Sequence, residues 1–234
     1  MKPTQTIAPL TNPLQVEFHC HTTYSKDSLT SLESLLKACQ LKKIDRVVIT
    51  DHNTLQGALR AKHMDPKLVI LGEEIMTQDG EIIAIFVKEE VPPGLTAMQT
   101  ITILREQGAF ICVAHPFDRL RKGHWKPDIL KEIVPYIDAI ESFNARCMFP
   151  GDNHRARNFA KEYELLTTVG SDAHTTFEIG KARMFLTDFH DTESLKQSLS
   201  KATIQVSLSA PWMHLFSRYA AWHKKTGKIL QDKN

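Results

Sequence analysis

Short apolar runs alternate along the chain with stretches in which apolar residues recur every three or four positions. The apolar runs predict strands at residues 16–18, 46–50, 68–71, 81–87, 109–114, 137–140, 166–169 and 183–186. The periodic stretches predict helices at residues 30–43, 54–64, 96–108, 152–165 and 191–199. This repeated alternation of strands and helices is typical of an α/β fold with a mainly parallel sheet.

Local signals mark the ends of some predicted helices. Thr30 with Glu33, and Thr96 with Gln99, have the spacing of a capping box, in which two side chains bond the free amides of a helix start. Gly108 is placed to end the second of these helices.

A last helix is predicted within residues 211–234, where aromatic and aliphatic residues are interleaved with lysine and arginine. One interpretation is a terminal helix packed on the core, with a solvated basic tail. The other is a basic amphipathic helix that meets a membrane surface, nucleic acid or a second subunit. We favour the first interpretation because it needs no partner.

Composition narrows the classes of protein to consider. The chain has 234 residues, 42% of them hydrophobic, and a formal net charge of +2, which excludes a strongly basic polyanion-binding chain. The four cysteines form no CxxC pair, so neither a zinc finger nor a disulfide scaffold is indicated. The first residues lack a signal-peptide pattern, and no apolar run is long enough to cross a bilayer. We therefore expect a soluble, cytoplasmic protein.

Histidine and carboxylate residues follow five of the predicted strands. They are His19, His21, His52, Glu74, His115, Asp172 and His174. The carboxyl ends of barrel strands meet at one face, so these side chains are expected to converge there. Residues two apart in a strand share a side, so His19 and His21 can bind one metal, as can Asp172 and His174.

Each cluster also has an ordinary explanation. An isolated HxH pair is commonly a surface or packing feature, Asp51 and Asp172 could be turn residues, and His115 could be a hydrogen-bonded core histidine. Asp51 diverges from the adjacent His52 and is expected to support the ligands from behind. The regular placement of all five clusters after strands favours a metal site over separate accidents.

The clusters together resemble the PHP (polymerase and histidinol phosphatase) family. The matching segments are HCHTTYSKDS (19–28), ITDHN (49–53), GEEI (72–75), AHP (114–116) and GSDAH (170–174), in the family's order. The resemblance implies a single-domain, TIM-like distorted (β/α)7 barrel. It places a metal-dependent phosphoesterase domain at residues 15–205, between an N-terminal extension (1–14) and a C-terminal helical basic tail (206–234).

The resemblance also implies two or three divalent metal ions, with Mn, Zn or Fe compatible with mixed nitrogen and oxygen ligands. Glu74 would bridge two metals. The first metal would be held by His19, His21, Glu74 and Asp172, the second by Glu74 and His115, and the third by Asp27, His52 and His174.

The chain departs from the family pattern at Gly80-Glu81, where many members have a histidine after the glycine. Glu81 would either coordinate as a carboxylate or leave the second metal weak or absent. Glu141 and Asn144 lie in a segment that resembles one lining the family's site, and we expect them to support it.

The activity implied is hydrolysis of a phosphate mono- or diester, in a small phosphorylated metabolite or a nucleotide, by a metal-activated hydroxide. No other catalytic group is assigned. Arg119, Arg146 and Lys181 are predicted to bind substrate, whereas Arg121 is interpreted as a solvated charge. Nucleic acid is not favoured because the stretch between His115 and Asp172 leaves no room for an additional domain.

Two other functions remain open at this stage. Related barrels with similar metal clusters hydrolyse C–N bonds, and a metal-stabilised domain could serve as a non-catalytic partner subunit. The near-complete ligand set argues against the second, and activity on phosphate esters but not amides would exclude the first. The oligomeric state is undetermined. Other histidines are interpreted as surface or packing residues, namely His63, His154, His190, His214 and His223.

Overall fold

The computed structural model describes residues 13–121 and 124–231. Its strands are β1 (Leu14–Cys20), β2 (Arg46–Ile49), β3 (Val69–Met76), β4 (Glu81–Ile85), β5 (Phe110–Val113), β6 (Ala139–Asn144), β7 (Leu166–Gly170), β8 (Ala182–Leu186) and β9 (Thr203–Val206). Its helices are α1 (Leu32–Leu41), α2 (Gln56–Met64), α3 (Ala97–Gln107), α4 (Pro127–Ile133), α5 (Pro150–Glu162), α6 (Thr192–Leu199) and α7 (Met213–Gln231). The first twelve residues of the expected N-terminal extension lie outside the described chain, and Leu14 already belongs to β1.

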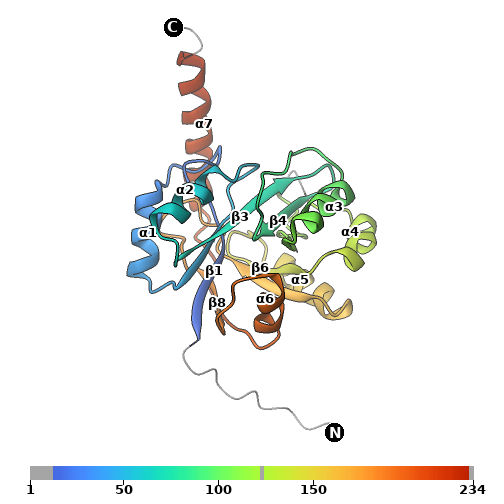
Figure 1. The fold of residues 1–234 in the computed structure, drawn as a ribbon. Helices are drawn as coiled ribbons and strands as arrows, with labels where there is room; N and C mark the ends of the chain where they lie inside the picture. The colour runs from blue at the N-terminus through green and yellow to red at the C-terminus, as the bar shows by residue number, and fades with distance from the viewer. Residues whose placement is uncertain (1–12, 122–123, 232–234) are drawn as a thin grey trace.

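The nine described strands form one sheet in the order β7-β6-β5-β4-β3-β2-β1-β8-β9. The sheet curves until β7 lies beside β1, where Cys20 and Ala173 form an isolated parallel bridge, so it is a nearly closed barrel. Figure 1 shows α1 and α2 on one side of the sheet and α3 and α4 on another.

Two strands break the expected regular (β/α)7 alternation. β4 is antiparallel to both β3 and β5, because only the short turn at residues 77–80 separates β3 from β4. β8 is antiparallel to β1 and β9, and no helix separates it from β7. Parallel pairing is confined to β1–β2, β2–β3, β5–β6 and β6–β7. The fold is mixed α/β, and the prediction of a mainly parallel sheet holds for half of the strand pairs.

The helix-end predictions have mixed outcomes. The Thr96–Gln99 capping box and the left-handed Gly108 at the end of α3 are confirmed. The box at Thr30 is wrong: Ser31 caps α1, while the Thr30 hydroxyl donates to the carbonyl of His174 at 2.9 Å. Thr30 thus connects the start of α1 to the loop after β7. Two elements, α4 and β9, were not predicted because they are short and have little hydrophobic pattern.

The C-terminal helix α7 is confirmed as a helix, but it packs through one face only. Met213 and Ala220 are buried against the barrel. On the other side of the helix, Leu215, Phe216, Tyr219 and Trp222 are more than half exposed, as is Trp212 just before it. The prediction that the apolar residues of this helix pack on the core is therefore wrong for most of them. Figure 1 shows α7 projecting from the body of the molecule. Within the described residues, no helix has both the length and the apolar character required for a membrane span.

A buried carboxylate that the sequence analysis missed joins β1 to the loop after β7. Glu17 is fully buried and accepts hydrogen bonds from the amides of His19, Ser171 and Gly180 and from the Ser171 hydroxyl. Burial raises the pKa of Glu17 to about 7, although these donors act in the opposite direction. Each oxygen of the carboxylate accepts two of the four hydrogen bonds. Replacing either oxygen by an N–H donor would therefore break two of them.

Replacement of Glu17 by glutamine is expected to destabilise the fold. The amide nitrogen of Glu17→Gln would face two donors, leaving buried groups unpaired at roughly 1–3 kcal/mol. For a chain of this size each kcal/mol lowers the melting temperature by about 2–4 °C. Calorimetry should show this drop for Glu17→Gln and no drop for Glu106→Gln, an exposed position on α3. Equal melting temperatures for both variants would contradict the assigned role.

Candidate metal centre

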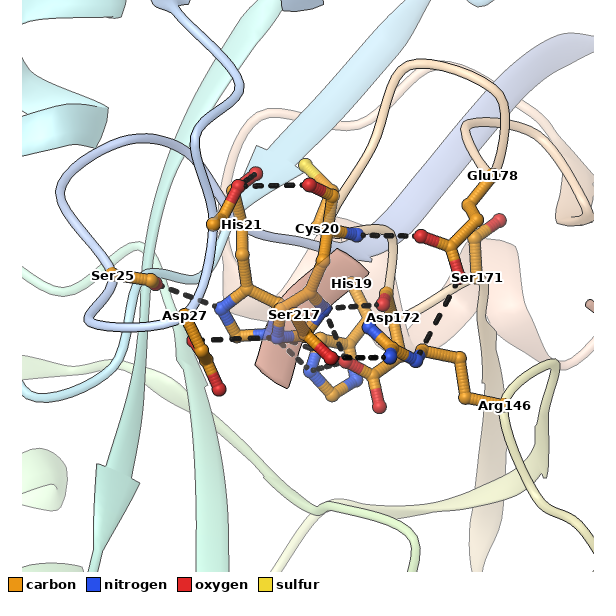
Figure 2. Close-up of polar contacts among 12 residues, drawn as sticks. His19, Cys20, His21, Ser25, Asp27, Arg146, Ser171, Asp172, Glu178 and Ser217 are labelled. Atoms are coloured by element: carbon orange, nitrogen blue, oxygen red, sulfur yellow. Dashed lines mark hydrogen bonds and ion pairs between the residues drawn. The ribbon is translucent and has the colours of Figure 1, made fainter. Parts of the chain in front are cut away.

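Side chains from six strands, or from the loops that follow them, converge at one end of the barrel. His19 lies in β1, His52 follows β2, Glu74 lies in β3, His115 follows β5 and Asp172 follows β7. Glu81 joins them because β4 runs in the opposite direction, so its first residue lies where the other strands end. Figure 2 shows His19, His21, Asp27 and Asp172 directed toward a common space.

Glu74 is central to this cluster. Its Oε1 lies 3.3 Å from Nε2 of His19 and 2.9 Å from Nε2 of His115. Its Oε2 lies 2.9 Å from Nδ1 of His52 and 3.5 Å from Nε2 of His21. Each oxygen of the carboxylate therefore faces two histidines, an arrangement suited to bridging two metal ions.

Two aspartates lie on other sides of the same histidines. Asp172 Oδ1 is 3.3 Å from Nε2 of His21, and the Nε2 atoms of His19 and His21 are only 3.2 Å apart. Asp27 reaches His52 and His174 with its two oxygens, at 3.5 and 3.4 Å. Glu81 lies 3.6 Å from His52 and 3.5 Å from His115, so its carboxylate also faces the cluster.

The donor set suits divalent metals. Four groups of three residues place their ligand atoms within 4.8 Å of one another: His21, His52 and His174; His19, His21 and Asp172; His19, Glu74 and His115; and His52, Glu74 and Glu81. One buried oxygen on each of Asp27, Glu74 and Asp172 accepts no hydrogen bond. Each of these oxygens instead faces a histidine nitrogen, so carboxylate and imidazole ligand atoms are paired around one space, which suits divalent metal ions.

Opposite charges dominate the electrostatics of the cluster. Burial disfavours the charged imidazole of His19, but Glu74, Asp172 and Glu141 outweigh it and hold the pKa of His19 well above the usual value. The pKa of His52 is likewise raised, by Glu74 and Asp27 against burial. Burial would raise the pKa of Glu74, yet His19 and His52 hold it well below its usual range. Without metal, protons on His19 and His52 compensate part of the carboxylate charge.

Residues behind the ligands fix the orientation of the imidazoles. His19 Nδ1 is 2.9 Å from Oε1 of Glu141, and His21 Nδ1 is 3.0 Å from the hydroxyl of Ser25, so both Nε2 atoms face the cluster. Asn144 donates to Glu141 and Asp172. Asp51 lies behind the cluster, as its spacing indicated, and accepts hydrogen bonds from Ser25 and from Thr22. Ser25 was not identified from the sequence, because no motif distinguishes it from other loop serines.

The hydrogen bond between Glu141 and His19 requires a glycine at position 170, the last residue of β7. A Cβ on Gly170 would lie 2.0 Å from Oε1 of Glu141 and 2.5 Å from Cβ of His19. Only glycine allows Glu141 to approach His19 closely enough to bond it.

Two family models match the chain. The PHP domain model matches residues 17–84, and the PHP-associated model matches residues 150–204. The chain belongs to the PHP family. This membership and the histidine–carboxylate cluster support a metal-dependent hydrolase that uses divalent metals.

Known proteins extend this similarity. The uncharacterized protein MJ0417 of Methanocaldococcus jannaschii is 37% identical over 172 residues, which are 72% of this chain and 69% of that protein. A structure from Bifidobacterium adolescentis, classed as a metal-dependent phosphoesterase, has a TM-score of 0.60 at 15% identity, covering 80% of this chain and 96% of its own. The lesion-specific endonuclease EndoQ of Pyrococcus furiosus has a TM-score of 0.54 at 14% identity, covering 85% and 59%. These two structures share the fold of this PHP chain.

Of the two arginines in the loop after His115, the one near the metal cluster is not the one that the sequence favoured. Arg119, predicted to bind substrate, instead pairs with Asp152 at 2.8 Å, and its side chain is 57% exposed. Arg121, interpreted as a solvated charge, is mostly buried and contacts Asp172 and Asp118. Proximity in sequence to His115 was misleading because the loop turns at Asp118 and directs the next arginine inward.

The two other predicted substrate residues lie in different places. Arg146 lines a cavity that also includes Asp27 and His174 of the cluster. Lys181 lines another cavity, with Lys42 and Arg183, whose described walls include no cluster residue. The structure therefore does not bring Lys181 to the cluster.

Metal binding is expected to release protons and to strengthen as the pH rises. The raised pKa values of His19 and His52 mean that both rings are protonated near neutral pH in the metal-free protein, whereas a metal binds the neutral ring. Calorimetric titration with Mn²⁺ in two buffers of different ionisation enthalpy would measure the protons released. His52→Ala should release fewer, and His154→Ala, at an exposed position on α5, should match the wild type. Proton release independent of His52 would contradict this assignment.

Proposed function

We propose that this chain hydrolyses phosphate esters at the metal centre. The supporting observation is the position of Arg121, whose guanidinium contacts Asp172 beside the cluster. Burial opposes the charge of this arginine, but Asp172, Glu81 and Glu74 hold its pKa well above its ordinary value. A fixed cation next to a metal cluster is suited to bind phosphoryl oxygens, whereas a neutral amide substrate offers it no charge to neutralise.

The geometry of the cluster supports the ligand sets that the family resemblance implies. One metal would lie between His19, His21 and Asp172, with Glu74 bridging to a second between His115 and Glu81. A third would lie between Asp27, His52 and His174, since the Asp27 oxygens lie 3.5 Å from His52 and 3.4 Å from His174. Bound metals would lower the pKa of water and neutralise charge on the phosphoryl group. Mn, Zn and Fe each suit this mixture of imidazole and carboxylate.

Substrate is expected to approach from the side of Asp27. The Asp27 side chain is 22% exposed, whereas every other proposed ligand is 7% exposed or less. A cavity of about 380 Å³ opens there, lined by Asp27, His174, Arg121, Arg146 and residues at the start of α7. Its volume is in the range of small-molecule sites, which favours a small phosphorylated compound over a folded nucleic acid.

The arginines provide a matched test of this function. We expect wild-type protein supplied with Mn²⁺ to hydrolyse an aryl phosphate or its diester, and a chelator to abolish the turnover. Arg121→Ala should lower kcat/KM by about 10²-fold, the size of effect seen when one charge-stabilising group is removed. Arg119→Ala should change it by less than about twofold, because Arg119 faces Asp152 and solvent.

Other outcomes would identify a different function. Turnover of amides but not phosphate esters would indicate a C–N hydrolase. Bound metal without turnover of either substrate class would indicate a non-catalytic partner subunit. Equal activity of the two arginine variants would contradict the role given to Arg121.

A further inference from the structure

Arg146 is a buried cation that the proposed chemistry does not use. It follows β6, and its side chain is only 3% exposed. Its Nη2 donates to the hydroxyl of Ser217 in α7 at 2.8 Å, and its Nε lies 3.6 Å from Glu178. Its Nη1 is buried and has no hydrogen-bond partner. A buried guanidinium nitrogen without an acceptor is unfavourable, so this position is suited to receive an anion.

Arg146 lies in the wall of a cavity that it shares with other polar side chains. Arg146, Arg121, His214 and Ser217 all line the cavity of about 380 Å³ that reaches Asp27 and His174. Figure 2 shows Arg146 and Ser217 close to the histidine–aspartate cluster. The ring of His214 lies 3.1 Å from the carbonyl of Arg146. Burial and the nearby Arg146 lower the pKa of His214, so its ring is neutral and adds no charge of its own at neutral pH.

The two arginines of this cavity have different partners. Arg121 contacts Asp172, a proposed metal ligand. Arg146 pairs with Glu178 and is held by α7, and among the described residues it forms no ion pair with a carboxylate of the cluster. The cavity therefore offers two separate positions for negative charge, one at the cluster and one beside α7.

We propose that Arg146, beside Ser217 and His214 of α7, binds a second anionic group of the substrate, separate from the phosphoryl group that is hydrolysed. This inference rests on the proposed function. The substrate class is then a phosphate ester that carries a further phosphate or carboxylate. The C-terminal helix, beyond the segments that match the family models, would determine this specificity.

Ser217 allows a matched pair of variants. In Ser217→Glu the new carboxylate would pair with Arg146 and occupy the anion position, whereas Ser217→Gln has the same size without charge. Ser217 is only partly buried on a helix, so neither change threatens the fold. The substrates are monophosphates of linear diols of two to six carbons and the corresponding bisphosphates, with metal-loaded protein.

The wild type should prefer the best-fitting bisphosphate over its monophosphate by about tenfold or more in kcat/KM, the value of one charge-assisted contact. Ser217→Gln should retain this preference, and Ser217→Glu should reduce the ratio to about one. Monophosphate turnover with no bisphosphate preference in the wild type would overturn the inference and leave the proposed function intact.

A binding measurement separates the two claims if turnover fails. Calorimetric titration with the non-hydrolysable bisphosphonate analogues should show binding to wild type and Ser217→Gln, and weaker binding to Ser217→Glu. That result without any turnover would support the anion site and contradict the proposed phosphoesterase. Equal binding to both Ser217 variants would overturn the anion site.

Discussion

The carboxylate of Glu74, buried among four histidines, is the interaction on which the arrangement of the site depends. Its two oxygens each lie within 3.5 Å of two imidazole nitrogens, from β1 and from the loops after β2 and β5. A buried negative charge of this kind is stable only beside compensating positive charge. Protons on His19 and His52 supply part of that charge in the metal-free protein, and divalent metals are proposed to supply it in the active one.

The sheet topology brings these groups together. Parallel strands deliver His19, His52 and Asp172 to one end of the barrel, and the reversed β4 delivers Glu81 from its first residue. Glu17 and Glu141 then connect the ends of β1, β6 and β7 through buried hydrogen bonds. The antiparallel strand β4 thus adds Glu81 to the site, which a regular parallel barrel would not do.

The sequence predicted that the histidine and carboxylate clusters converge, because most of them follow recognisable strands, whereas Asp27 and Glu81 were inferred only from the family resemblance. It could not predict contacts that depend on loop conformation. Arg119 and Arg121 are the same residue type in the same loop. Only the turn at Asp118 decides which of them faces Asp172. The alternating pattern of β1 predicts a solvent-facing side chain at Glu17. The loop after β7 buries it instead. The reversal of β4 follows from a tight turn that carries no hydrophobic signal.

The contacts of the C-terminal helix α7 also could not be predicted from its hydrophobic pattern. Its apolar residues suggested packing on the core, yet only Met213 and Ala220 are buried, and polar side chains of the helix also contact the barrel. Lys224 donates to the carbonyls of Thr23 and Ser25 in the loop that contains Asp27, and Ser217 bonds Arg146. The helix therefore contacts the buried Arg146 and the loop that contains Asp27, and both of these residues line the cavity at the site. Its aromatic side chains remain exposed.

The central claim is that Glu74 bridges metals in a cluster. Anomalous diffraction from crystals grown with Mn²⁺, collected at the manganese absorption edge, would locate the ions directly. The account predicts at least two peaks, about 3.5–4 Å apart, with the Glu74 carboxylate between them. A single peak away from Glu74, or no peak, would contradict it.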